Sequence, residues 1–316
     1  MDGAPHVPVM AEEALAWLRV RPDGLYVDCT AGAGGHSAMV AARLESGRLL
    51  ALDRDPAAAA MARERLAAWP AAEVVRANYG ELKGVLARLG WGAVDGVLLD
   101  AGVSSMQIDL PERGFSFQVD GPLDMRMDTE SPVTAASWLR GVSEEELAAA
   151  LREFGDIRPA RRIARAVAER CRAGRMERTP DLVEAVCGAL PFVRGVPDEV
   201  RTVFQAVRMA VNGELDWLRR GLGQALDALA PGGRLVVITF HSGEDRVVKE
   251  VFRAASRPAV ELDRHGRRTA SLPARFRLPL AKPATPGPEE TRANPRSKSA
   301  RLRVAERLDE NGAVKE

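Results

Sequence analysis

Short apolar runs alternate with amphipathic stretches over the first hundred residues of the chain. Three of these runs end at an acidic residue, namely Asp28, Asp53 and Asp100. After the second run, residues 56–68 place alanine, methionine and leucine at helical spacing behind Pro56, a residue that the first turn of a helix tolerates. Strands that alternate with helices predict a parallel sheet with right-handed crossovers.

The alternation stops near residue 106 and resumes near residue 201. Between these points the sequence predicts helices, one of which begins at a capping box formed by Ser143 and Glu146. The later expected elements are a helical region (198–229), a strand (234–240), a helix (247–254) and an edge strand (300–307). We therefore expect a Rossmann-like α/β fold, a doubly wound, mostly parallel sheet built from residues 1–105 and 201–316, with an inserted helical domain at 106–200. An insertion after the fourth strand lies beside the carboxyl edge of the sheet, so we expect it to help bind the substrate.

The loop after the first strand carries the most informative chemistry. It reads Asp28-Cys-Thr-Ala-Gly-Ala-Gly-Gly-His-Ser37, and its glycines, Gly34 and Gly35 among them, let a ligand approach the main chain. The next strand ends at Asp53, which is placed to accept hydrogen bonds from ribose hydroxyls. These features together predict a nucleoside-binding unit.

Two residues favour S-adenosylmethionine over a dinucleotide as the ligand of this unit. Ser37 stands where a dinucleotide site has its third glycine. Asp28 places a negative charge beside the loop, which would repel a pyrophosphate and attract the ammonium and sulfonium groups of the methyl donor. The alternative from another enzyme class is a nicotinamide-dependent oxidoreductase.

Composition and charge narrow the class further. A hydrophobic content of 46% with 28% charged residues is that of a soluble globular protein, and no apolar run approaches the length of a membrane span. Cys29, Cys171 and Cys187 lack the spacing of a zinc site or a disulfide framework, so we expect a cytoplasmic protein with no metal. Residues 253–303 hold thirteen Lys or Arg against four Asp or Glu, a local balance of +9 in a segment expected to be weakly structured. This charge suits a polyanion, and the alternative is a solvated tail.

Several polar residues at the predicted carboxyl edge could carry chemistry. A carboxylate at Asp100 could bind the ammonium of the donor or hydrogen-bond an amine that is to be methylated, and the alternative is that it caps a turn. Gln107 could reach the same ligand, and His36 could contact the cofactor. Tyr79 could stack on an adenine or could be a partly buried core residue.

A second group of polar residues is a candidate for substrate contact. Four of them form one stripe at helical spacing: Arg201, Gln205, Arg208 and Asn212. These residue types bind phosphates and base edges, and the ordinary alternative is a solvated helix face. His241 could contact the substrate or fix its own loop. Arg296 and Lys298 belong to the basic segment and are candidates for RNA contact.

Several phrases along the chain resemble the bacterial ribosomal RNA small-subunit methyltransferase H family. The matching segments are His6-Val-Pro-Val-Met, the glycine loop, Leu52-Asp-Arg-Asp-Pro56, Leu99-Asp-Ala-Gly-Val-Ser-Ser105, Arg113-Gly-Phe-Ser-Phe, Asp120-Gly-Pro-Leu-Asp-Met-Arg-Met-Asp128, Thr202-Val-Phe-Gln-Ala-Val-Arg208, Phe240-His-Ser-Gly-Glu-Asp-Arg246 and Asn294-Pro-Arg-Ser-Lys-Ser. They span nearly the whole chain in family order.

The resemblance implies a class I methyltransferase fold, S-adenosylmethionine as the methyl donor, and methylation of the exocyclic N4 amine of a cytidine in the decoding region of 16S rRNA. It implies a nearly assembled small ribosomal subunit as the substrate, and neither a membrane nor an obligate protein partner is expected. The cofactor positions of the family correspond here to Gly34, Gly35, His36, Asp53, Tyr79, Asp100 and Gln107.

One departure concerns the chemistry of the base. Many methyltransferases that act on base amines carry an Asn/Asp/Ser-Pro-Pro-aromatic tetrapeptide after the fourth strand, whereas this chain has Asp100-Ala-Gly-Val. A catalytic role for Asp100 is therefore a hypothesis. Two other hypotheses are a non-catalytic ribosome-assembly factor that binds RNA through the basic segment, and a methyltransferase that acts on DNA or on a different RNA.

Overall fold

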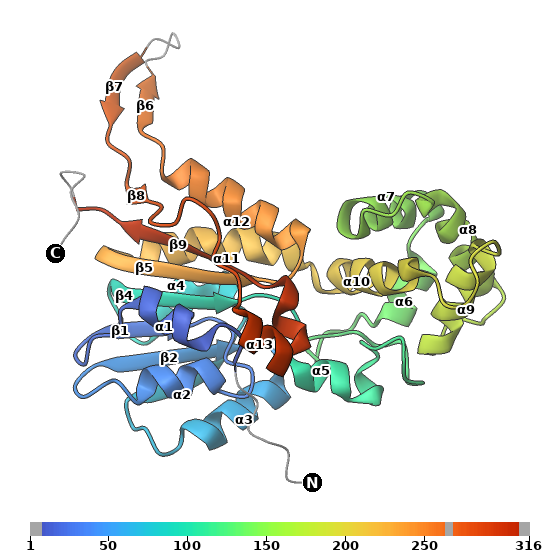
Figure 1. Ribbon diagram of the computed structural model, residues 1–316, viewed down its shortest axis with the longest axis horizontal. Helices are drawn as coiled ribbons and strands as arrows, with labels where there is room; N and C mark the ends of the chain where they lie inside the picture. Colours follow the sequence, from blue (N-terminus) through green and yellow to red (C-terminus); the bar gives the residue numbers. More distant parts are fainter. Residues whose placement is uncertain (1–7, 263–267, 310–316) are drawn as a thin grey trace. The chain divides into compact units, whose positions relative to one another are not determined.

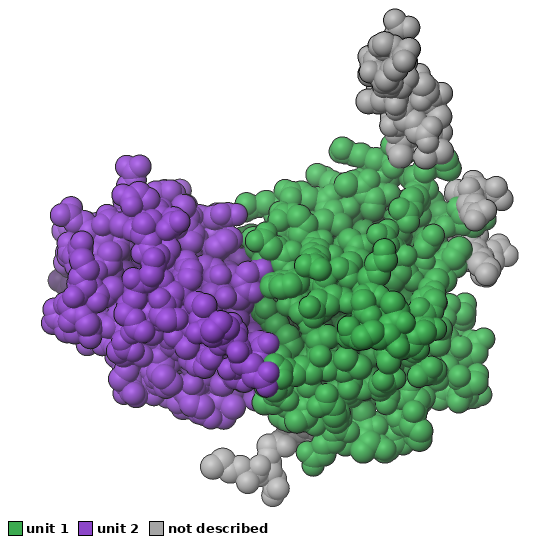
Figure 2. Space-filling view, turned by 180° about the vertical axis from the view of Figure 1, so that it is seen from behind, with its two compact units in different colours: residues 1–102, 215–316 green, residues 103–214 purple. Residues whose placement is uncertain are grey.

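The computed structural model describes residues 8–262 and 268–309, and the chain divides into two compact units. Unit 1 comprises residues 1–102 and 215–316, and unit 2 comprises residues 103–214 (Figures 1 and 2). The helical unit therefore extends further along the chain than the 106–200 expected from the sequence. The start of the His6 segment and part of the basic segment, residues 263–267, lie outside the described residues.

Unit 1 is built on a seven-stranded sheet with the order β3-β2-β1-β4-β5-β9-β8. Its strands are β1 (Leu25–Asp28), β2 (Arg48–Asp53), β3 (Ala72–Arg76), β4 (Val94–Asp100), β5 (Leu229–Thr239), β8 (Phe276–Arg277) and β9 (Arg301–Arg307). The first five pair in parallel, whereas β9 runs antiparallel to both of its neighbours. The chain order reverses between β1 and β4, and ligands of such sheets bind outside the carboxyl ends of the strands at that point. The expected doubly wound, mostly parallel sheet is confirmed.

Helices cover both faces of this sheet (Figure 1). One face packs α4 (Leu82–Arg88), α11 (Glu214–Ala228) and α12 (Ser242–Ala255), and the other packs α1 (Ala11–Leu18), α2 (Gly35–Ala41) and α3 (Pro56–Leu66). Because side chains alternate along a strand, Val97 and Leu99 of β4 join the first cluster while Leu98 joins the second. A strand covered on both faces is apolar at successive positions, which is why Val97, Leu98 and Leu99 show no alternation.

The C-terminal part of unit 1 differs from the sequence-based expectation. β9 is not the edge of the sheet, because the two-residue strand β8 pairs with it through Phe276 and Arg277. The segment expected to be weakly structured contains a hairpin of β6 (Ala259–Leu262) and β7 (Arg268–Leu272). It also contains the short helix α13 (Pro288–Ala293) and the 3-10 turn η3 (Pro295–Ser299).

Unit 2 is helical and has its own apolar core. Its helices are α5 (Ser105–Asp109), α6 (Ala135–Gly141), α7 (Glu144–Gly155), α8 (Ala160–Arg172), α9 (Thr179–Ala189) and α10 (Asp198–Asn212). The predicted capping box at Ser143 and Glu146 starts α7. The expected helical region 198–229 is two helices, because Gly213 adopts a left-handed conformation (φ 58°) after α10. The apolar face of α10 packs into the core of unit 2, so this unit extends beyond residue 200. None of the described helices is long and apolar enough to span a membrane.

Candidate functional site

The glycine loop joins the end of β1 to the start of α2. Gly34 precedes α2 with a left-handed backbone (φ 77°), and the helix begins at Gly35. A Cβ on Gly35 would lie 2.5 Å from Cγ of Pro8, so only glycine permits this approach of the chain that leads into α1. The loop shape therefore depends on glycine at both positions.

Asp28 shapes this loop from within. Its carboxylate is buried and accepts hydrogen bonds from the Ser37 hydroxyl at 2.6 Å and from the Thr30 backbone N–H at 3.1 Å. Burial raises the pKa of Asp28, while His36, Ser37 and Thr30 act to lower it. The carboxylate is turned inward and holds the loop, and its electrostatic attraction for a cationic donor stays a prediction.

Asp53 connects the end of β2 to the same loop. Its Oδ2 accepts a hydrogen bond from the Gly32 N–H and its Oδ1 one from the Asp55 N–H, each at 2.8 Å. Burial raises the pKa of Asp53 to about 6 against the lowering effect of these two hydrogen bonds. A carboxylate oxygen can accept more than one hydrogen bond, so the expected contact with ribose hydroxyls stays a prediction that this geometry permits.

Asp100 and His36 lie together beside the loop, at the carboxyl end of β4. The Asp100 N–H donates to the Thr30 hydroxyl at 2.7 Å, and Oδ2 of Asp100 lies 3.8 Å from Nδ1 of His36. His36 contacts the Val9 carbonyl oxygen through Nε2 at 3.1 Å, which assigns the ring proton to Nε2 in the neutral form. Oδ1 of Asp100 is buried and has no hydrogen-bond partner within residues 8–262 and 268–309.

The charge on Asp100 is costly in this position. Burial raises the pKa of Asp100 well above its usual value, and the carboxylates of Asp28 and Glu244 raise it further. A buried acceptor without a partner destabilises the free protein, and a ligand that donates a hydrogen bond to it removes this destabilisation. Among the expected site residues of unit 1, Asp100 is the one whose geometry most directly calls for a ligand.

Tyr79 lies in the short turn η1 (Tyr79–Glu81) after β3, and its ring packs on α11. A Cβ on Gly221 would lie 2.4 Å from Cδ2 of Tyr79, so this helix presents bare backbone to the ring. Tyr79 is half-buried against the apolar cluster of that face. The partly buried core position is confirmed, and stacking on an adenine stays a prediction.

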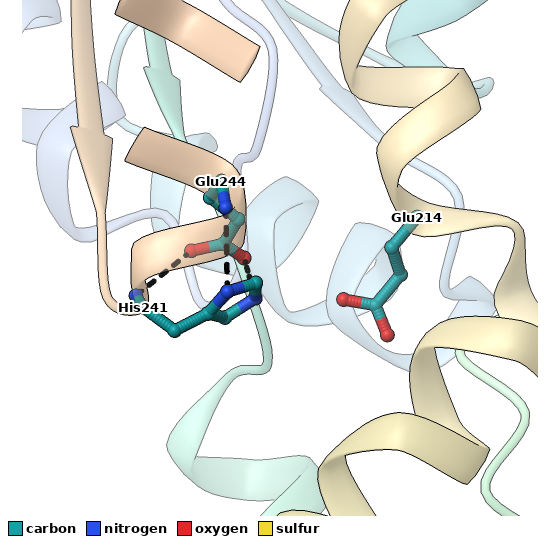
Figure 3. A group of neighbouring side chains, drawn as sticks. All are labelled: Glu214, His241 and Glu244. Carbon is teal, nitrogen blue, oxygen red and sulfur yellow. Dashed lines mark hydrogen bonds and ion pairs between the residues drawn. The ribbon is translucent and has the colours of Figure 1, made fainter. Parts of the chain in front are cut away.

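His241 caps the N-terminus of α12, as Figure 3 shows. Its Nδ1 accepts a hydrogen bond from the Glu244 N–H at 3.3 Å, and the Glu244 carboxylate accepts from the N–H groups of Phe240 and His241 at 2.9 and 3.3 Å. The structure therefore gives His241 the loop-fixing role that was one of the two alternatives. Contact with the substrate stays a prediction.

Four of the expected site residues that lie in unit 2 take part in contacts within that unit. Gln107 is buried, and its Oε1 accepts from the Ser104 N–H to complete the capping box of α5. On α10, Gln205 donates to the Phe154 carbonyl at 3.1 Å, Arg208 forms a bidentate pair with Glu214 at 2.8 Å, and Asn212 bonds to the backbone of Met125 and Met127.

Of the predicted polar stripe, Arg201 is the exposed member. The other three side chains hold unit 2 together, which a helical stripe in sequence cannot reveal. Their contact with a substrate stays a prediction.

The basic segment is partly used inside unit 1. Arg301 and Arg303 of β9 both bind the carboxylate of Asp245, the first at 3.1 Å and the second at 2.7 and 3.1 Å. Burial acts to raise the pKa of Asp245, but the hydrogen bonds from the two arginines lower it overall. Arg296 and Lys298 in η3 are exposed, so they are the members of the expected set that a polyanion can reach.

The structure therefore brings together the glycine loop, His36, Asp53 and Asp100 at the carboxyl ends of β1, β2 and β4. Sequence reasoning missed Thr30, whose hydroxyl ties β4 to the glycine loop. Its position between Asp28 and the glycines was the available signal.

The comparison with known proteins identifies the family of the chain. Residues 3–308 match the model of the MraW methylase family. The chain belongs to this family. A relative from Methylococcus capsulatus named Ribosomal RNA small subunit methyltransferase H is 48% identical over 94% of this chain and 99% of its own length. One of the same name from Thioalkalivibrio sulfidiphilus is 47% identical over 98% of this chain and all of its own length.

Solved structures that resemble this methylase are more distant. An rRNA methylase from Streptococcus thermophilus covers 98% of this chain and 99% of its own, at 13% identity and a TM-score of 0.41. A likeness at that level adds nothing to the family assignment, which rests on the sequence.

Proposed function

We propose that this methylase transfers a methyl group from S-adenosylmethionine to the exocyclic N4 amine of a cytidine in the decoding region of 16S rRNA, within the small ribosomal subunit. The family assignment supports methyl transfer, and relatives with 44–48% identity are named for the RNA of the small subunit. The observation that carries the proposal is the buried Oδ1 of Asp100 beside the glycine loop, which has no hydrogen-bond partner among the residues that the structure describes.

The residues present fit the donor. Asp100 offers an acceptor that the donor's ammonium would satisfy, and Asp53 offers a carboxylate to the ribose hydroxyls. Gly34 and Gly35 give the loop its shape, because Gly34 has a left-handed backbone and a Cβ on Gly35 would meet Pro8. When bound, S-adenosylmethionine supplies a methyl group activated by its sulfonium. No metal is part of this proposal.

The chain contributes alignment and electrostatics to the transfer. Methyl transfer is an in-line displacement, so the rate depends on how the donor and the acceptor amine are positioned. The loop held by Asp28 and Ser37 fixes the donor side. Asp100 has two proposed uses, to bind the donor's ammonium or to hydrogen-bond the amine, and the Asp100→Asn variant described in the Discussion distinguishes them. We assign substrate recognition to unit 2.

The experiment that tests the function uses purified small ribosomal subunits that lack the modification and labelled S-adenosylmethionine. The RNA is digested, the nucleosides are identified by mass spectrometry, and the modified position is mapped on fragments. N4-methylcytidine in the decoding region supports the proposal. Donor binding without transfer to the subunit overturns the substrate, and absence of donor binding overturns the cofactor.

A further inference from the structure

A hollow of about 460 Å³ in unit 2 is lined almost entirely by arginine, at the point where α7 ends and α8 begins. Its lining residues are Arg152, Arg158, Pro159, Arg161 and Arg162. All four arginines are exposed, and no ion pair joins any of them to a carboxylate within the part of the chain that the structure describes. We call these four residues the arginine pocket.

The position of two of these arginines works against the stability of α8. Arg161 and Arg162 lie in the first turn of the helix, which has no acidic residue and no side-chain cap. Cations near a helix N-terminus oppose the helix dipole, and other helices of the chain, such as α7 and α12, begin with acidic residues instead. A charge placement that costs helix stability indicates that an external anion is the partner of the pocket.

An exposed aromatic ring lies beside the arginine pocket. Phe192, in the connection between α9 and α10, is 81% exposed, and the guanidinium carbon of Arg162 lies 5.0 Å from the centre of its ring. Val193 and Val196 of the same connection are exposed as well. An exposed apolar ring beside the positive charges of the arginine pocket suits a ligand that is both flat and anionic.

Single-stranded nucleic acid has this combination of groups. Its binding sites join a positively charged groove that follows the backbone to aromatic side chains on which bases stack. Resting on the proposed function, we infer that the arginine pocket binds phosphodiester groups of single-stranded RNA and that Phe192 stacks on a base of the same segment. The site is separate from the residues of unit 1 that hold the donor, and it identifies the surface of unit 2 that engages the RNA.

The test measures binding of the full-length protein to a fluorescein-labelled, single-stranded RNA of mixed sequence across a range of salt concentrations. The test variant is Arg158→Gln with Arg161→Gln. The matched control is Arg172→Gln with Arg175→Gln, which removes the same charge from exposed positions at the other end of α8. Each phosphate contact that is lost lowers the slope of log affinity against log salt by about 0.7. We expect a slope smaller by about 1.4 for the pocket variant and little change for the control.

Phe192→Ala tests the stacking step. Loss of one base–aromatic stack is expected to weaken binding of single-stranded RNA roughly 5- to 150-fold, with rescue by Phe192→Trp and with little effect on duplex RNA of the same sequence. Thermal unfolding followed by circular dichroism checks that all variants fold. A pocket variant with the same affinity and slope as the control overturns the inference. A poly-glutamate peptide serves as a second probe, for an acidic protein partner. If Phe192→Ala loses binding to this peptide and keeps its affinity for RNA, the inference is overturned in favour of a protein partner.

The methyl-transfer assay separates this inference from the proposed function. If the parent protein methylates the subunit while the pocket variants bind RNA normally, the pocket inference alone fails. If it transfers no methyl group while the pocket variants lose RNA binding, the proposed function fails and the pocket stands.

Discussion

Replacing Asp100 by asparagine removes one charge from the candidate donor site with almost no change of shape. In the free protein its Oδ1 atom is buried and has no hydrogen-bond partner in the described residues, and the carboxylates of Asp28 and Glu244 raise the pKa of the side chain. The substitution therefore relieves a cost in the folded state and removes the group that the donor's ammonium would bind. We expect Asp100→Asn to be more stable than the parent and weaker in binding the donor.

The magnitudes follow from the partners that the carboxylate lacks and would gain. Asparagine keeps an unpaired polar atom at this position but carries no charge, so the repulsion from Asp28 and Glu244 disappears and a gain in the free energy of unfolding of about 1 kcal/mol is expected. A hydrogen bond to a charged group contributes about 1.5–3 kcal/mol, and its loss raises the Kd for S-adenosylmethionine roughly 10- to 150-fold.

The assay combines isothermal titration with S-adenosylmethionine and urea unfolding of the same preparations. Asp216→Asn, at a side chain of α11 that is 93% exposed, is the matched control and should change neither quantity. An unchanged Kd in Asp100→Asn would refute the assignment of the ammonium to Asp100. If turnover on the small subunit falls while the Kd is unchanged, the carboxylate acts on the amine of the cytidine instead.

Three further predictions address other parts of the protein. Because the pKa of Asp53 is raised to about 6, its carboxylate is protonated below that pH, so the affinity for the donor should fall as the pH drops from 7 to 5. In titration calorimetry, the donor affinity of Asp53→Asn should not change over this pH range. Glu306→Gln leaves the Arg234 guanidinium buried without its counter-charge at 2.9 Å, and urea unfolding should show a loss of about 3–5 kcal/mol; a loss below 1 kcal/mol would contradict this account. Joint neutralisation of Arg296 and Lys298 should lower the salt slope of binding to the small subunit by about 1.4 while donor affinity is unchanged, and an unchanged slope would reduce this turn to a structural role.

The strands that form the site were predictable because their signals are local. The runs that end at Asp28, Asp53 and Asp100 are apolar, bounded and separated by helices, so pattern alone located three strand ends at one edge of the sheet. The two-residue strand β8 could not be found in this way, because it is too short to show a period.

The direction of individual side chains was much harder to predict than the elements that carry them. Asp28 is buried and turned toward Ser37, and Arg208 is paired with Glu214, and neither partner can be identified from the sequence pattern. A sequence shows which face a residue occupies but not which partner lies within hydrogen-bond reach. The arginine pocket was missed for a related reason, since Phe192 and Arg162 are 30 residues apart in the chain and meet only in the folded unit.

The discontinuity of unit 1 has a consequence for the order in which a newly made chain can fold. Unit 2 is one continuous segment, so all of its residues have left the ribosome while β9 is still to be synthesised. Until then β5 keeps an open, apolar edge, because its partner on that side is β9. Domains tend to fold as units during synthesis. The helical insertion can therefore be complete while the sheet that surrounds it in sequence is still exposed to aggregation and dependent on its final strand.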